Sequence, residues 1–129
     1  MTTRYNFLIA DDIIFNRFLL KEIVADLADH VHEAQNGQQA IEILKEHPID
    51  IILMDIEMPV MNGLEATRYI REQLGSPLDQ TTVIALTAHN PSDFFKHFER
   101  AGFDHLITKP YSIDKLKQVI RSLDNIKSS

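Results

Sequence analysis

The stretch IILMDIEMPVMNG, residues 51–63, places a single aspartate, Asp55, at the end of an apolar run. The run, which we take as residues 49–54, is typical of a strand covered on both faces. A carboxylate in this place either caps the helix that follows or stands as a reactive group at the mouth of a sheet. The segments on either side of the run decide between these two interpretations.

Outward from this strand, apolar runs and amphipathic stretches alternate along the whole chain. Short apolar runs predict strands over residues 4–10, 30–34, 49–54, 81–88 and 103–109. Helical spacing of apolar residues predicts helices over residues 14–27, 36–47, 62–74, 91–101 and 111–123. Strands that alternate with helices in this way predict an α/β fold, in which helices cover both faces of a parallel sheet.

Length and composition describe one ordinary domain. The 129 residues are 44% hydrophobic, so we expect a single domain over residues 1–129. The chain has no cysteine, which excludes a disulfide framework, a thiolate metal site and a cysteine nucleophile. A net charge of -6 argues against general affinity for nucleic acid. The sequence shows neither a membrane-spanning apolar run nor a signal peptide, so we expect a cytoplasmic protein without membrane contact.

Polar residues stand where the predicted strands end. Asp11 and Asp12 follow the first strand, Asp55 the third, Thr87 the fourth and Lys109 the fifth. Because the carboxyl ends of parallel strands meet at one edge of the sheet, we expect these five side chains to converge there. The second strand offers no comparable group at its end.

The chemistry of this set favours phosphoryl transfer. Three crowded carboxylates repel one another unless a cation offsets their charge, and a small set of oxygen ligands favours Mg²⁺. Thr87 and Lys109 remain as donors for an incoming anion. A carboxylate nucleophile, a divalent metal, an ammonium and a hydroxyl together make a site that accepts a phosphoryl group.

Four motifs carry a resemblance to a known family: LIADD, ILMDIEMPVMNG, VIALTA and ITKP, in this order between about residues 5 and 125. Together they resemble the response regulator receiver domain of two-component and phosphorelay signalling, in the form of a chemotaxis-regulator-like single domain. The resemblance implies a flavodoxin-like (βα)5 fold with strand order 2-1-3-4-5. It also implies that Asp55 accepts a phosphoryl group from a phosphohistidine on a histidine kinase or a histidine phosphotransfer protein.

The resemblance further implies the role of each site residue. Asp12 and Asp55 bind Mg²⁺ directly together with the main-chain carbonyl of Glu57, while Asp11 acts mainly through water. Thr87 and Lys109 contact the phosphoryl oxygens. A receiver is not an enzyme in the usual sense, since it is a phosphoacceptor that assists its own phosphorylation and dephosphorylation.

The resemblance also implies a cis peptide bond between Lys109 and Pro110.

Two positions depart from the family pattern. Leu106 stands three residues before Lys109, where the family usually has Tyr or Phe. We therefore expect this receiver to signal by onward phosphotransfer, or by contact of another surface with a downstream effector protein. The second is Ile13, which stands where an Asn or other polar residue often follows the acidic pair. The first helix is also unusually apolar at its start, and Ile14 and Phe18 either dock a helical phosphotransfer partner or form part of the core.

Single residues of the set also allow purely structural roles, and the whole set allows two rival functions. Asp12 alone is explained by helix capping, and His30 and His32 by surface positions better than by a metal site. A phosphorylation-independent interaction module of the same fold is one rival function. A haloacid-dehalogenase-like phosphohydrolase is a weaker one, because it needs a second aspartate where Glu57 stands.

Overall fold

The computed structural model describes residues 4–88, 101–110 and 112–127, and within them the strands form one parallel sheet. The strand order is β2-β1-β3-β4-β5, as the resemblance implied. The strands are β1 (Tyr5–Ala10), β2 (Ala28–Ala34), β3 (Ile51–Asp55), β4 (Thr82–Thr87) and β5 (His105–Thr108). The flavodoxin-like doubly wound fold is therefore confirmed.

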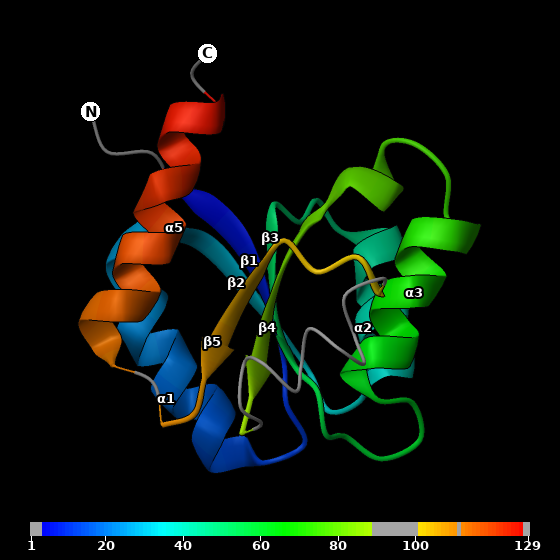
Figure 1. Ribbon diagram of the computed structural model, residues 1–129, viewed down its shortest axis with the longest axis horizontal. Helices are drawn as coiled ribbons and strands as arrows, with labels where there is room; N and C mark the ends of the chain where they lie inside the picture. The colour runs from blue at the N-terminus through cyan, green and yellow to red at the C-terminus, as the bar shows by residue number, and fades with distance from the viewer. Residues whose placement is uncertain (1–3, 89–100, 111, 128–129) are drawn as a thin grey trace.

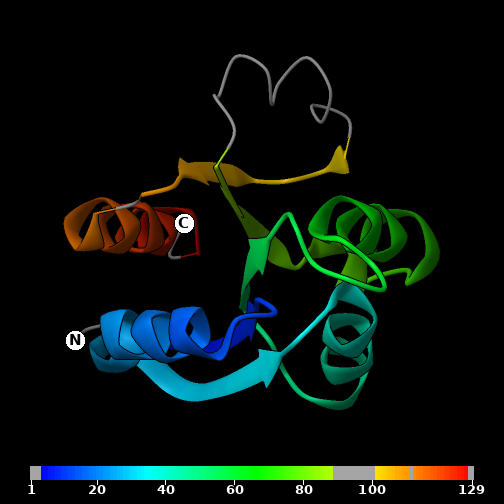
Figure 2. The same ribbon diagram turned by 90° about the horizontal axis from the view of Figure 1, so that it is seen from below.

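Helices cover both faces of this sheet (Figures 1 and 2). Helices α1 (Ile14–Val24) and α5 (Ile113–Lys127) lie on one face, and α2 (Gly37–Glu46) and α3 (Gly63–Gln73) lie on the other. Two short 3₁₀ turns, Ala25–Leu27 and Leu78–Gln80, complete the described elements. The helix predicted over residues 91–101 lies outside the described residues, apart from Ala101.

The sheet separates two apolar clusters. One includes Phe7, Ile9 and Leu53 together with apolar residues of α1 and α5, and the other includes Leu8, Ile52 and apolar residues of α2 and α3. Alternate residues of a strand point to opposite faces, so both faces of β1 and β3 are apolar. Every residue of β3 is buried, as predicted for a strand covered on both sides.

Several boundaries differ from the sequence-based ones. The helix predicted to reach Leu27 ends at Val24, and the 3₁₀ turn carries the chain from there into β2. β2 begins at Ala28, two residues earlier than predicted, because Ala28 pairs with Tyr5 of β1, although the register shifts before His30 pairs with Asn6. As an edge strand, β2 has a solvated side and a weak apolar signal.

The start of α1 settles one alternative. Ile14 and Phe18 are 73% and 60% exposed, so the interpretation that they belong to the core is wrong. Ile13 and Phe15 are exposed beside them, which leaves an apolar surface next to Asp12. No helix in the described part of the chain combines the length and apolarity that crossing a membrane requires.

Candidate functional site

The predicted site residues meet at the carboxyl edge of the sheet. Asp55 is the last residue of β3 and Thr87 the last of β4, while Asp11 and Lys109 directly follow β1 and β5. Oxygen atoms of Asp11, Asp12 and Asp55 all lie within 4.8 Å of one another. Parallel pairing of neighbouring strands brings these residues together from distant parts of the chain.

Lys109 forms an ion pair with Asp55. Its Nζ lies 3.1 Å from Oδ1 of Asp55, whose side chain is nearly buried. The main-chain N–H of Glu57 donates to the same oxygen at 3.4 Å. The main chain of Lys109 is held as well, since its N–H donates to the carbonyl of Thr87 at 2.6 Å. Lys109 is thus tied to β4 through its backbone and to β3 through its side chain.

One further feature of this edge matches what the resemblance implied: the Lys109–Pro110 peptide bond is cis. Thr87 is 1% exposed at the end of β4. Asp12 does not cap the first helix, because the N-cap of α1 is Ile13, which makes no side-chain capping bond.

Opposing effects act on the pKa of Asp55. Burial raises the pKa of the Asp55 carboxyl above its usual value, because the charged form loses water. The Lys109 ammonium lowers this pKa again, and the nearby Asp11 carboxylate adds to the rise. The net result is a raised pKa, which means that ionising Asp55 costs free energy in the absence of further positive charge.

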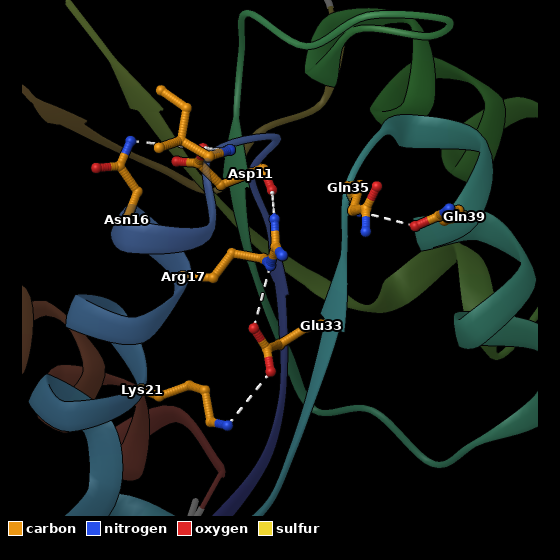
Figure 3. Close-up of polar contacts among 8 residues, drawn as sticks. Asp11, Asn16, Arg17, Lys21, Glu33, Gln35 and Gln39 are labelled. Atoms are coloured by element: carbon orange, nitrogen blue, oxygen red, sulfur yellow. Dashed lines mark hydrogen bonds and ion pairs between the residues drawn. The ribbon is translucent and has the colours of Figure 1, made fainter.

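Asp11 is held by several hydrogen bonds (Figure 3). Its N–H donates to the carbonyl of Ala34 at 3.0 Å, and its own carbonyl accepts from Nη1 of Arg17 at 2.8 Å. Its Oδ1 accepts from the N–H of Ile13 at 2.9 Å and from Nδ2 of Asn16 at 3.5 Å. Its Oδ2 is buried and has no hydrogen-bond partner among the described residues.

These observations fit a divalent cation. A buried carboxylate oxygen without a donor is unfavourable, and a cation satisfies it. The side-chain ligands on offer are carboxylate oxygens, which suits Mg²⁺ with its preference for oxygen ligands and retained waters. Asp11, Asp12 and Asp55 are therefore the side chains that would hold the ion.

The loop after Asp55 is shaped by local sequence. Asn62 and Glu65 form a capping box, with Glu65 N–H donating to Oδ1 of Asn62 at 2.8 Å and Asn62 N–H donating back at 3.1 Å. A side chain at Gly63 would collide with the main-chain oxygen of Asp55, so only glycine lets α3 start this close to β3. The N–H of Gly63 donates to the carbonyl of Ile56 at 2.9 Å, which closes the loop beside the site.

Sequence reasoning missed two residues that support the site, Arg17 and Glu33. Arg17 lies on α1 and is only 7% exposed, and it forms an ion pair with Glu33 of β2 at 3.1 Å. A signal was present in the sequence, because Arg17 stands three residues before Leu20 and so shares the apolar face of its helix. A charged residue on a buried face needs a partner, and here that partner is Glu33.

A family model described as the response regulator receiver domain matches residues 7–121. The chain belongs to this family. Receiver domains are signalling phosphoacceptors of two-component and phosphorelay systems, and they bind Mg²⁺ at an acidic pocket.

Individual proteins similar to this receiver domain support the assignment. Stress response regulator protein 1 of Candida dubliniensis is 34% identical over 128 residues, which are 96% of this chain and 43% of that protein. The chain thus spans less than half the length of this relative. A solved receiver domain of a sensor histidine kinase from Pseudomonas aeruginosa PAO1, with magnesium coordinated in its active site cleft, is 26% identical with a TM-score of 0.81. That match covers 93% of this chain and 97% of the other.

A second solved structure is the co-crystal of the Saccharomyces cerevisiae histidine phosphotransfer protein Ypd1 with the receiver domain of the response regulator Ssk1. The match has 28% identity and a TM-score of 0.82, and covers 93% of this chain and 88% of that one. The similarity to both structures extends over nearly the whole receiver domain described above.

Proposed function

We propose that Asp55 is the phosphoacceptor of this receiver domain and takes a phosphoryl group from a phosphohistidine. The observation that carries the proposal is the ion pair of Asp55 with Lys109, set within 4.8 Å of Asp11 and Asp12. A nearly buried carboxylate with one cation on one side and two further acids on the other is arranged to bind a metal and an anion together. A structural role alone does not account for this grouping.

In the proposed step an oxygen of the Asp55 carboxylate attacks phosphorus and forms a P–O bond. The P–N bond to the donor histidine breaks, and its electron pair stays on the imidazole nitrogen, which then takes up a proton from water. Lys109 and Thr87 donate hydrogen bonds to the phosphoryl oxygens and so stabilise the charge that builds up on them. Asp11, Asp12, Asp55 and the Glu57 carbonyl would hold Mg²⁺, which would supply positive charge to the same oxygens.

The proposed donor is a histidine kinase or a histidine phosphotransfer protein. Ile14 and Phe18 are exposed apolar residues at the start of α1, beside the acidic edge of the sheet. They would pack against an apolar helical surface of the partner. The similarity to a receiver domain that crystallised with Ypd1 supports such a partner. We also propose that the domain does not bind nucleic acid directly, because its net charge is negative.

Leu106 bears on how the signal leaves the domain. It is partly buried and packs against the cluster formed by Ile56 and Ala85. An aliphatic side chain here does not provide the ring movement that the family usually uses. We therefore propose output by onward phosphotransfer, or by contact of another surface with an effector.

The test is incubation with acetyl phosphate and Mg²⁺ followed by intact-mass measurement. We expect a gain of one phosphoryl group, which is lost with EDTA and in Asp55→Asn. Asp29→Asn is the matched control, because Asp29 is an exposed acid on β2 and its loss should leave the labelling unchanged. An unlabelled wild-type protein under these conditions would favour the phosphorylation-independent interaction module instead.

A further inference from the structure

Arg17 links the acidic edge of the sheet to the edge strand β2 (Figure 3). Its Nη1 donates to the main-chain carbonyl of Asp11 at 2.8 Å, and its Nε donates to Oε1 of Glu33 at 3.1 Å. The guanidinium thus lies between the loop that carries the metal-site acids and a carboxylate of the neighbouring strand. The other oxygen of Glu33 accepts from Nζ of Lys21 at 3.3 Å.

The contacts of Asp11 leave one atom free. Its N–H, its carbonyl and its Oδ1 are all occupied by protein donors or acceptors, while its buried Oδ2 has no hydrogen-bond partner among the described residues. Among the described side chains that bind Asp11, Arg17 is the one that also forms an ion pair with another residue, Glu33. The direction of Oδ2 depends on how firmly that main chain is held.

We propose that Arg17, braced by Glu33, is a positioning residue that holds the Asp11 main chain so that Oδ2 remains available to Mg²⁺. The inference rests on the proposed metal site and adds a specific claim to it. Arg17 does not touch the ion or the phosphoryl group. Its planar fork suits this task, since its separate N–H groups reach the carbonyl and the carboxylate at the same time.

If only the charge of Arg17 mattered, removing it would change the affinity for Mg²⁺ in the opposite direction. The direction of the change therefore tests the proposal. A cation near a dication site weakens metal binding by repulsion, so removing the charge alone would tighten Mg²⁺ binding. Removing a positioning contact loosens Asp11 and weakens Mg²⁺ binding. Glu33 pairs with Arg17 at 3.1 Å and offsets part of its charge, so we expect the positioning effect to dominate.

The experiment is a calorimetric Mg²⁺ titration of the wild-type protein and three variants at fixed ionic strength, with the melting temperature of each measured separately. Arg17→Met keeps the length and removes both hydrogen bonds, and we expect the Mg²⁺ dissociation constant to rise roughly tenfold. Arg17→Lys keeps the charge but loses the planar arrangement of N–H donors. Its Mg²⁺ dissociation constant should therefore lie between those of wild type and Arg17→Met. Lys21→Met is the matched control, because Lys21 pairs with the same Glu33 without contacting Asp11, and it should stay within about twofold of wild type.

Each outcome bears on the proposal. Unchanged or tighter Mg²⁺ binding in Arg17→Met would overturn it, because a charge effect or a purely structural role would then suffice. If Arg17→Met does not fold, Arg17→Lys decides: wild-type affinity in that variant overturns the proposal. Failure of the wild-type protein itself to bind Mg²⁺ would refute the proposed metal site, and with it this inference, and is seen separately from either variant result.

Discussion

Lys109 Nζ lies 3.1 Å from Oδ1 of Asp55, although 54 residues separate the two in the chain. The contact forms because β5 and β3 both pair with β4, so the residue that follows one strand and the residue that ends the other reach the same edge. The relationship is both structural and chemical. The ion pair partly offsets the effect of burial on the pKa of Asp55, and it places a cation where phosphoryl oxygens would arrive.

Replacing Lys109 tests the second of these roles. We expect Lys109→Met to slow labelling by acetyl phosphate by roughly tenfold to a hundredfold, since one donor to the phosphoryl oxygens is lost. Lys115→Met removes an exposed lysine of α5 and serves as the control. The measurement is the initial rate of the mass gain. Equal rates in Lys109→Met and wild type would exclude a role for this ammonium in the transfer.

Asp55→Asn should stabilise the metal-free protein at neutral pH. Burial raises the pKa of Asp55, so the stability it contributes is present below the unfolded pKa of 3.8 and is lost as pH rises through the folded pKa. In EDTA at neutral pH the variant should therefore melt at a higher temperature than wild type, and the difference should vanish near pH 3. Added Mg²⁺ should raise the melting temperature of wild type only. A variant that is less stable than wild type in EDTA would show that the Lys109 pair outweighs the burial.

His32 should make the fold sensitive to mild acid. Its ring stacks on that of His47 with centroids 4.3 Å apart. Burial lowers the pKa of His32 below 6.5, and the charges of His47 and His30 lower it further. The stability that neutral His32 contributes is therefore fully present above its unfolded pKa of 6.5. It is lost as the pH falls through the lower pKa of His32 in the folded state.

The His32→Gln variant measures this effect. We expect the decline of the melting temperature below pH 6.5 to become shallower in this variant, because the neutral amide has no proton to gain. His105→Gln, on the opposite edge of the sheet, is the control and should keep the wild-type decline. Parallel curves for His32→Gln and wild type would show that other groups govern the acid sensitivity.

The apolar start of α1 should matter for transfer between proteins only. We expect Ile14→Ala and Phe18→Ala to slow phosphotransfer from a phosphorylated histidine phosphotransfer protein while the free energy of unfolding changes by less than about 0.5 kcal/mol. Labelling by acetyl phosphate needs no docking and should be unchanged. Tyr69→Ala, at a 38% exposed aromatic of α3, is the control. Slower acetyl phosphate labelling in the two α1 variants would mean that they disturb the site itself.

Arg71 should be important for stability. Its guanidinium donates to the carbonyls of Gly102, Asp79 and Thr81 at 2.9, 2.8 and 2.7 Å. It also pairs with Asp104 at 2.9 Å. Removing it in Arg71→Met leaves these acceptors without their donor, which should cost about 2 to 4 kcal/mol of unfolding free energy.

Denaturant unfolding gives this value directly. The control is Arg68→Met, since Arg68 is an exposed arginine on the same helix and its loss should cost less than about 0.5 kcal/mol. Similar values for the two variants would show that water replaces the Arg71 contacts at little cost.

Much of the site was predictable because its residues occupy strand ends. The positions of Asp11, Asp55, Thr87 and Lys109 follow from apolar runs that stop at a polar residue, and parallel topology then brings the ends together. The contacts of Arg17 with Asp11 and Glu33 were not predictable in the same way, since they depend on the distance from α1 to β2. The boundary of β2 was also misjudged, because its exposed edge weakens the apolar pattern.

By itself the sequence determined the α/β architecture, the strand order implied by its motifs, and the family. Periodicity reports which face of each element is apolar, and motif spacing reports which residues end the strands. Only the tertiary structure decided that Ile14 and Phe18 are exposed and that Arg17 reaches both Asp11 and Glu33. The reason is physical: exposure and long-range hydrogen bonds depend on which elements pack over a residue and at what distance. A local sequence pattern does not specify this packing.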